Sequence, residues 1–217
     1  MLIRTPNIYR PQSDTWLLAE ALAQAALPRG GQAVDICSGT GALAVRAGLA
    51  GARSVTAVDI SRAAAATTWL NCRVHGIKAE ILYGDFETAL ATRRFDVLLA
   101  NPPYVPAHDR VPVRGRARAW HAGHDGRSIL DRLCTLAPTL LADYGTALIV
   151  HSTVADPDLT ITQLRDGGLK AAVVARATIP FGPVMRRCTN HLLASGLIQT
   201  GQQYEELVVI RADKTRK

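Results

Sequence analysis

Four short apolar segments, each predicted to be a buried strand, run into acidic, asparagine or glycine-rich residues. The segments are 33–37, 54–58, 79–83 and 95–100, and the residues at their ends are the 35–41 turn, Asp59, Asp85 and Asn101. Residues with helical periodicity lie between them, so strand and helix alternate at intervals of about 20 to 30 residues. This alternation predicts an α/β fold built on a doubly wound parallel sheet. Because ligands bind at the carboxyl ends of such strands, the polar residues are expected to form one site.

The rest of the chain is predicted to complete a single domain that spans residues 1–217. Further helices are expected at 13–27, 128–141 and 158–166, and further strands at 146–151, 171–176 and 206–211. Residues 1–30 form a helical lead-in, for which Ser13 or Asp14 is the expected N-cap. Residues 182–201 are longer than a simple hairpin requires, so we predict an insertion with a short helix before the last strand.

The first strand leads into a glycine turn, Asp35-Ile-Cys-Ser-Gly39-Thr-Gly41, that suits close approach of the backbone to a ligand. Asp59 follows Gly41 by eighteen residues, where a carboxylate can accept hydrogen bonds from both ribose hydroxyls of a nucleoside. Asp85 is placed to accept a hydrogen bond from an adenine amino group. These residues therefore predict an adenosine-containing cofactor.

The same glycines followed by Asp59 also satisfy the dinucleotide fingerprint, so a nicotinamide-dependent oxidoreductase is a rival interpretation. Asp35 counts against it, because a carboxylate within the turn repels a pyrophosphate but attracts a cationic sulfonium with an amino-acid tail. A dinucleotide also leaves the residues after the fourth strand without a role. The sequence favours S-adenosylmethionine as the cofactor.

Those residues, Asn101-Pro102-Pro103-Tyr104, are the most specific signal in the chain. Two prolines fix the backbone and remove two N–H donors, so the local carbonyl groups act as acceptors. The Asn101 side-chain oxygen and the Pro102 carbonyl can then accept both hydrogens of a planar –NH2 group. Such bonds orient the nitrogen and stabilise the positive charge that develops on it during methylation. Tyr104 is expected to pack on a flat part of the substrate.

The composition, 48% apolar and 20% charged, is that of an ordinary soluble globular protein. No stretch approaches the roughly 18 to 20 apolar residues of a membrane helix, and residues 1–14 lack the apolar core of a secretion signal. The four cysteines form no CxxC pair, so neither a zinc ribbon nor a disulfide framework is indicated. We therefore expect a cytoplasmic protein with no membrane contact.

The net charge of +7 favours an anionic partner such as RNA, DNA or a ribonucleoprotein. Arginines crowd the segment after the proline turn, with Arg127 and Arg132 close behind; the crowded ones are Arg110, Arg114, Arg116 and Arg118. This cluster is a candidate contact with ribosomal RNA, tRNA or an acidic protein surface, although a solvated loop is the alternative. Arg186 and Arg187 are expected on a solvated face.

The strand-end residues together resemble the class I methyltransferases that modify amino nitrogens. Residues 9–18 (YRPQSDTWLL) and 119–127 (AWHAGHDGR), with Asp131 and Arg132, narrow this to the release-factor glutamine N5-methyltransferases, which are HemK-like, in their short form. The resemblance implies a Rossmann-like, seven-stranded, mostly parallel sheet with an antiparallel last strand. It implies methylation of the glutamine in the Gly-Gly-Gln loop of a release factor, and a small zinc-binding activator subunit. It also implies cofactor contacts by Thr15, Asp35, Cys37, Asp59, Asp85, Phe86 and Asn101.

The chain departs from the family pattern at Cys37, where the family usually has glycine. N6-methylation of adenine in DNA or RNA uses the same –NH2 chemistry and is the runner-up function. A non-catalytic cofactor-binding protein is a further alternative, against which the intact proline turn argues. Trp120 is a candidate for shaping the substrate entrance. No metal site is predicted, since no carboxylate or thiol completes one near His121 and His124.

Overall fold

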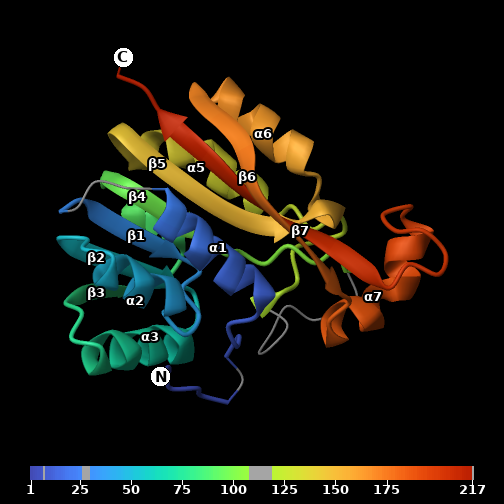
Figure 1. The fold of residues 1–217 in the computed structure, drawn as a ribbon, viewed down its shortest axis with the longest axis horizontal. Helices are drawn as coiled ribbons and strands as arrows, with labels where there is room; N and C mark the ends of the chain where they lie inside the picture. The colour runs from blue at the N-terminus through green and yellow to red at the C-terminus, as the bar shows by residue number, and fades with distance from the viewer. Residues whose placement is uncertain (7, 26–29, 108–118, 217) are drawn as a thin grey trace.

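The computed structural model describes residues 1–6, 8–25, 30–107 and 119–216 (Figure 1). Its centre is a seven-stranded sheet in the order β3-β2-β1-β4-β5-β7-β6. The strands are β1 (Gln32–Ile36), β2 (Ser54–Asp59), β3 (Ala79–Tyr83), β4 (Phe95–Ala100), β5 (Leu141–Ser152), β6 (Leu169–Pro180) and β7 (Tyr204–Lys214). Neighbours from β3 to β5 pair in parallel, whereas β7 runs antiparallel to both β5 and β6. The predicted doubly wound sheet with an antiparallel last strand is confirmed.

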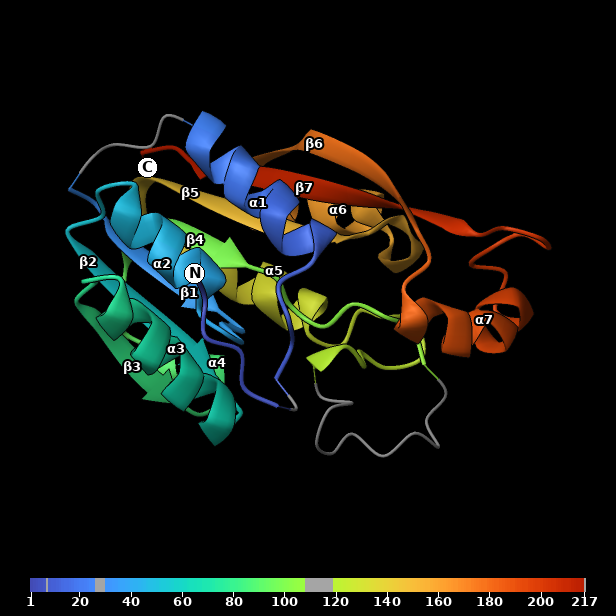
Figure 2. The same ribbon diagram turned by 60° about the horizontal axis from the view of Figure 1, so that its bottom comes forward.

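Helices cover both faces of the sheet (Figures 1 and 2). They are α1 (Ser13–Gln24), α2 (Ala42–Leu49), α3 (Arg62–Val74), α4 (Phe86–Leu90), α5 (Leu130–Leu140), α6 (Pro157–Asp166) and α7 (Pro183–Ala194), with a short 3-10 turn, η2 (Thr153–Ala155). Within the described part of the chain, no helix has the length and apolarity needed to cross a membrane.

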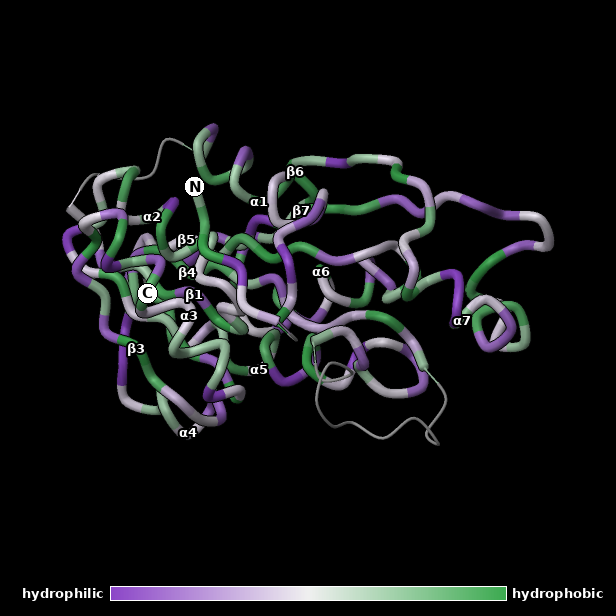
Figure 3. The backbone as a smooth tube through the Cα atoms, turned by 90° about the horizontal axis from the view of Figure 1, so that it is seen from below, coloured by the Kyte–Doolittle hydropathy of each residue, from purple (hydrophilic) through white to green (hydrophobic). Residues whose placement is uncertain are grey.

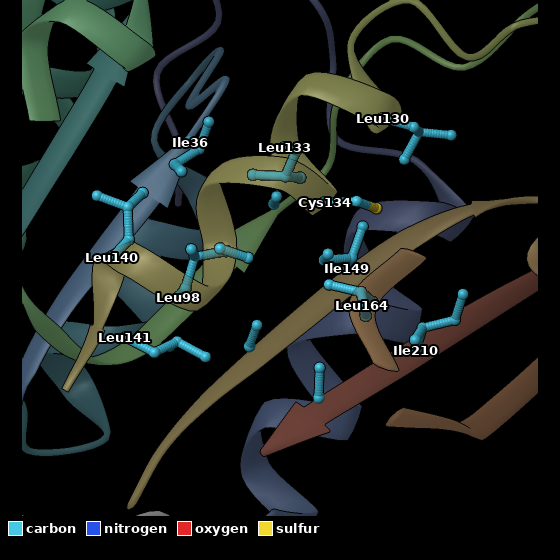
Figure 4. Packing of buried hydrophobic residues seen from close by; sticks show 14 of the residues in the cluster. Ile36, Leu98, Leu130, Leu133, Cys134, Leu140, Leu141, Ile149, Leu164 and Ile210 are labelled. Carbon is cyan, nitrogen blue, oxygen red and sulfur yellow. The ribbon is translucent and has the colours of Figure 1, made fainter. Parts of the chain in front are cut away.

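Successive strand residues face opposite sides of the sheet and so build two apolar cores. On one side, α1, α2 and α3 pack on residues such as Leu99 and Val150. On the other, α4, α5 and α6 pack on residues such as Leu98 and Ile149, and Figure 4 shows the side chains of α5 meeting those of the strands. The central strands β1, β2, β4 and β5 are thus buried on both faces for most of their length, which their almost continuous apolar sequences favour, whereas the edge strands β3 and β6 are partly exposed.

The predicted helices and strands are all present, with three differences. The cap of α1 is Gln12, which makes no side-chain cap bond, so the expected cap by Ser13 or Asp14 is wrong. Asp14 instead accepts a hydrogen bond from the Tyr9 hydroxyl at 2.5 Å and is buried. The helix α4 was not predicted, and β5, β6 and β7 are longer than expected.

Strands β6 and β7 form an antiparallel ribbon that extends beyond the rest of the sheet. Their pairing extends from Leu169↔Lys214 to Pro180↔Tyr204, whereas β5 pairs with β7 only as far as Leu207. The ribbon continues past the end of β5 and carries α7 at its tip (Figures 1 and 2). Hydrophobic and hydrophilic segments alternate along α7, as Figure 3 shows. The expected short helix in 182–201 is confirmed, and its apolar side packs on Tyr104, Val105 and Trp120.

Candidate active site

The sheet order reverses between β1 and β4, so the connections after these strands diverge to opposite faces and leave a cavity. The cavity has a volume of about 710 Å³. Its described lining comes from residues 8–14, the ends of β1, β2 and β4, the loop after β3, residues 119–132, the end of β6, and the beginnings of α7 and β7. The strand-end residues predicted to share one site therefore do meet at one edge of the sheet.

The turn after β1 is held in a left-handed conformation at three positions: Cys37 (φ 61°), Gly39 (φ 55°) and Gly41 (φ 77°). Cys37 and Gly39 line the cavity. Gly41 lies behind it, where an added Cβ would approach the Cγ2 of Thr68 to 2.7 Å. Gly41 thus permits the close packing of α2 on α3, which fixes the direction of the turn.

Asp35 lies behind the turn, almost completely buried. Its Oδ2 accepts a hydrogen bond from the Ala44 amide at 2.9 Å, which anchors the first turn of α2. Its Oδ1 is buried with no hydrogen-bond partner among the described residues. Burial, together with the charge of Asp59, raises the pKa of Asp35 to about 8, although the Ala44 hydrogen bond opposes this. An unpartnered carboxylate oxygen of this kind suits a neighbouring cation or hydrogen-bond donor.

Asp59 ends β2 and faces the same turn. Its two oxygens accept backbone hydrogen bonds from Gly39 at 2.9 Å and Ser61 at 2.8 Å. Burial raises the pKa of Asp59, and these two bonds act in the opposite direction. Each carboxylate oxygen has a second lone pair, so Asp59 retains acceptor capacity toward the cavity that it lines.

Asp85 caps the short helix α4 by accepting the Glu87 amide hydrogen bond at 3.0 Å. The Arg132 guanidinium contacts its other oxygen at 2.6 Å. Partial burial by itself would raise the pKa of Asp85, but the bond to Arg132 and the Arg132 charge outweigh it and lower the pKa. The Arg132 guanidinium also lies 4.9 Å from the centre of the Phe86 ring. Asp85, Phe86 and Arg132 thus form a preformed wall of the cavity.

The side chain of Asn101 is oriented by α1. Its amide nitrogen donates a hydrogen bond to the Thr15 hydroxyl at 3.1 Å, and that hydroxyl donates to Asp14 Oδ1 at 3.1 Å. Because the nitrogen is engaged, the side-chain oxygen of Asn101, which has no partner among the described residues, is left as an acceptor. Asn101, Pro102, Pro103 and Tyr104 all line the cavity.

Tyr104 is also tied to α1 by its hydroxyl, which donates to Asp14 Oδ2 at 3.1 Å. The Tyr9 hydroxyl shares this acceptor. Burial is the main cause that raises the pKa of both phenols, and the Asp14 charge adds to it. Asp14 is therefore the common acceptor that fixes both ends of the proline turn, through Thr15 to Asn101 and directly to Tyr104.

The loop after the turn returns along it. The Val105 amide donates to the Trp120 carbonyl at 2.9 Å, and Val105 and His121 form an isolated parallel bridge. Gly126, at a φ of 79°, lets this loop approach closely, since an added Cβ would lie 2.4 Å from the Tyr104 carbonyl oxygen. The proline turn is thus enclosed by α1 on one side and by the 119–127 loop on the other.

Most of the predicted site residues line the cavity together: Cys37, Gly39, Asp59, Asp85, Phe86, Asn101, Pro102, Pro103, Tyr104 and Trp120. Three do not, because Thr15, Asp35 and Gly41 lie behind this lining layer and support it. The predicted basic cluster at Arg110, Arg114, Arg116 and Arg118 lies outside the described residues.

Comparisons with known proteins agree with this geometry. Residues 10–114 match the family model of the methyltransferase small domain. The chain is 30% identical over 182 residues to a putative protein N5-glutamine methyltransferase of Methanocaldococcus jannaschii, which covers 83% of this chain and 90% of that protein. The chain belongs to the HemK-like N5-glutamine methyltransferases.

Solved structures share the fold of this methyltransferase. The E. cuniculi Mtq2–Trm112 complex, described as responsible for methylation of the eRF1 translation termination factor, matches with a TM-score of 0.63 and 18% identity over 96% of this chain and 99% of that chain. A T. thermophilus 16S rRNA methyltransferase in complex with AdoMet and guanosine matches with a TM-score of 0.59 and 22% identity over 94% of this chain and 44% of that chain.

Sequence reasoning missed four residues that the methyltransferase fold brings to the cavity: Tyr9, Asp14, His121 and Glu205. Tyr9 and Asp14 stand within the N-terminal stretch 9–18, so their spacing around Pro11 was an available signal. Glu205 stands at the beginning of the last strand and gave no such signal. Arg127, grouped in the sequence with the basic loop, is instead buried and bonded inside the protein.

Proposed function

We propose that this methyltransferase transfers a methyl group from S-adenosylmethionine to the side-chain amide nitrogen of a glutamine in a translation release factor. The observation that carries the proposal is the fixed orientation of Asn101. Its amide nitrogen is bound to Thr15, which leaves its oxygen as a free acceptor, and both Asn101 and Pro102 line the cavity. The Asn101 oxygen and the Pro102 carbonyl are the two acceptors that the two hydrogens of a planar –NH2 group require.

The residues around the β1 turn fit S-adenosylmethionine. Asp59 has free acceptor capacity for ribose hydroxyls, and Phe86 and Asp85 border the place for an adenine ring. Asp35 lies behind the cavity lining, and its charge, when ionised, suits the positive end of this cofactor across that layer. The cofactor supplies an electrophilic methyl group. The neighbouring carboxylates, by contrast, oppose the binding of a dinucleotide pyrophosphate.

The protein contributes orientation and electrostatic stabilisation to the reaction. Asn101 Oδ1 and the Pro102 carbonyl accept hydrogen bonds from the two N–H groups of the glutamine amide. These bonds direct the lone pair of the nitrogen toward the methyl group. As the N–C bond forms and the S–C bond breaks, positive charge develops on the nitrogen, and the two oxygens stabilise it. The nitrogen then loses one proton to solvent, which leaves a neutral N-methyl amide.

The names of the relatives support a glutamine substrate, and the eRF1 activity described for Mtq2 supports a release factor. The test is incubation of the full chain with labelled cofactor and a purified release factor, followed by mass spectrometry of the Gly-Gly-Gln peptide. We expect one added methyl group on the glutamine and none in a factor whose loop glutamine is replaced by alanine. An unmodified peptide together with labelled N6-methyladenine in added DNA or RNA would favour the runner-up function.

We further propose that a small subunit assists this chain, as Trm112 accompanies Mtq2 in the solved complex. β3 is an edge strand of the sheet, and Trp69, Val74 and Tyr83 nearby are exposed apolar side chains. Co-expression with a small zinc-binding protein from the same cell should raise the melting temperature. A methyltransferase that is equally stable and active alone would argue against this partner.

The contact of Arg110, Arg114, Arg116 and Arg118 with RNA or the ribosome remains a prediction. Replacement of all four by glutamine should weaken binding of ribosomes or RNA and reduce its salt dependence. Unchanged binding would assign these arginines to a solvated segment.

A further inference from the structure

Two polar side chains of the cavity have a buried atom that none of the described residues satisfies. They are His121 Nε2 and Glu205 Oε2, and the two residues are only 7% and 5% exposed. Both line the cavity that contains Asn101. Buried polar groups in folded proteins almost always have a partner, so two such atoms at one cavity indicate groups supplied by a ligand.

The hydrogen bond that His121 accepts decides which ring nitrogen carries the proton. The Gly123 amide donates to its Nδ1 at 3.2 Å, so Nδ1 carries no proton. The neutral ring therefore carries its proton on Nε2, the unpartnered atom. The position of the ring is fixed by the bridge between His121 and Val105 and by contact with the Trp120 ring at 5.8 Å between centres.

Glu205 acts as an acceptor. It stands near the beginning of β7, opposite Ile179 in the ribbon that carries α7. Burial raises its pKa, a hydrogen bond from the Ser152 hydroxyl opposes this, and the charge of Asp14 raises it further. One oxygen of Glu205 thus faces a hydroxyl, and the other, Oε2, has no described partner.

The methyl-transfer step proposed above uses neither His121 nor Glu205, although the charge of Glu205 acts on Tyr9 and Tyr104 beside the proline turn. Trp120, the neighbour of His121, packs with Val184 and Met185 of α7, and this surface together with His121 and Glu205 is called the α7 wall. The proposed cofactor residues belong to other elements: Asp59 is the last residue of β2, and Asp85 follows β3.

We propose that the α7 wall binds the main chain of a polypeptide substrate on either side of the methylated glutamine, an inference that rests on the proposed function. The His121 Nε2–H group donates to a backbone carbonyl, and Glu205 Oε2 accepts a backbone N–H. A peptide offers one donor and one acceptor at each residue, which matches this pair. A nucleic acid would bring phosphates toward Glu205 and Asp14, which repel them.

The test combines substrate and enzyme changes. Peptides that contain Gly-Gly-Gln are made with each flanking peptide bond replaced in turn by an ester, which removes one N–H. With the full chain, plus its small subunit if the chain alone is inactive, one ester position should lower kcat/KM by about tenfold or more. Glu205→Met has no acceptor at that place. For this variant, kcat/KM for the same ester peptide should be less than about twofold below its kcat/KM for the unmodified peptide.

His121 is tested by His121→Phe, which keeps a ring but removes the donor. KM for the peptide should rise about tenfold, and His121→Gln, which places an N–H near the same position, should restore part of the loss. The matched controls are His124→Phe, at an exposed position, and Glu206→Met, at a partly exposed position that is paired with Arg176; both positions lie outside the cavity, so KM for the peptide should stay at its wild-type value. Cofactor affinity should stay unchanged in all four variants.

An equal ester penalty in wild type and Glu205→Met at every position would overturn the role of Glu205, and an unchanged KM in His121→Phe would overturn that of His121. If Glu205→Met does not fold, Glu205→Gln replaces it, and the penalty must shrink because the acceptor loses its charge. If the wild type methylates neither the peptides nor a release factor, the proposed function fails, and this inference with it.

Discussion

At the scale of single residues, Cys37 combines a functional position with an unfavourable backbone. Its φ of 61° lies in the left-handed region, which costs a residue with a Cβ about 1 to 2 kcal/mol. A glycine at this position would adopt it without this cost. The sulfur atom packs against the apolar core beside the cavity, so its contacts offset part of the strain.

The strain can be measured by comparing two substitutions. Cys37→Ala loses the sulfur but keeps a Cβ, whereas Cys37→Gly loses both. We expect Cys37→Gly to be more stable than Cys37→Ala by about 1 kcal/mol in the free energy of unfolding, even though glycine gains entropy in the unfolded chain. Urea unfolding measures this difference, and a less stable glycine variant would show that the backbone at residue 37 is unstrained.

Asn101 separates chemistry from cofactor binding. In Asn101→Ala one acceptor for the reacting amide is lost, so kcat should fall at least about a hundredfold. The dissociation constant for S-adenosylmethionine should change much less, because Asp35, Asp59 and Asp85 remain. Single-turnover kinetics and calorimetry measure the two quantities. Near-normal turnover on the true substrate would contradict the proposed role of Asn101.

Asp35 should make stability depend on pH. Burial raises its folded-state pKa to about 8, above the roughly 3.9 of an unfolded aspartate. The stabilising contribution of the protonated form is therefore complete below about pH 4 and is lost as pH rises toward 8. We expect the melting temperature of the protein without cofactor to fall between pH 5 and pH 8.5 by more than in Asp35→Asn.

The cofactor provides a second readout for Asp35. A bound cation favours the ionised carboxylate, so binding should release a proton near pH 7 in the wild type but not in Asp35→Asn. Calorimetry in two buffers of different ionisation enthalpy detects this proton. Equal heats in both buffers would show that Asp35 is already ionised in the free protein.

At the scale of elements, a buried arginine joins α5 to the turn before α6. The Arg127 side chain is 3% exposed and binds Asp131 at the beginning of α5. It also donates hydrogen bonds across to Ala155, Asp156, Thr160 and Gln163. Its carbonyl acceptors at Ala155 and Asp156 would lack this partner if the guanidinium were removed.

Arg127→Met should therefore destabilise the protein by about 3 kcal/mol, because it leaves buried acceptors unsatisfied. Arg186→Met, at an exposed position on α7, should change stability by less than about 0.5 kcal/mol. Denaturant unfolding of the two variants compares them directly. If the two variants were equally stable, water would have to satisfy the carbonyl acceptors in Arg127→Met in place of the guanidinium.

The elements differ in how well the sequence predicted them. Strands β1 to β4 were predictable because apolar runs end in polar residues at Asp59, Asp85 and Asn101. The helix α4 was not, because it has only five residues and Asp85 serves both as its cap and as a site residue. The ribbon was underestimated, since partly exposed side chains such as Arg176 and Glu206 stabilise it by pairing across strands.

The site was predictable only where its chemistry shows in local spacing. The proline turn and the aspartates are of this kind. Asp14 was assigned to a cap, because the same sequence position suits a helix start and a tertiary acceptor. His121 and Glu205 could not be found, since what distinguishes them is the lack of a partner in the folded protein.

At the scale of the whole molecule, one sheet connects every described element. The cores on its two faces share the strands, so neither can be lost alone, and residues 1–217 are predicted to unfold as one domain. We expect a single transition by circular dichroism, with equal calorimetric and van't Hoff enthalpies. A separate earlier transition, absent when residues 182–201 are replaced by a short turn, would identify α7 as an independent unit.

The cavity has a charge opposite to that of the molecule that contains it. The chain carries +7 overall, yet the described cavity residues include Asp14, Asp59, Asp85 and Glu205, against a single arginine that is already paired. The positive charge of the whole molecule attracts acidic partners over long distances, whereas the acidic cavity does not favour an anionic group at short range. A well-matched substrate is acidic over its body and uncharged at the tip it inserts, so that added salt slows its arrival but does not hasten its departure.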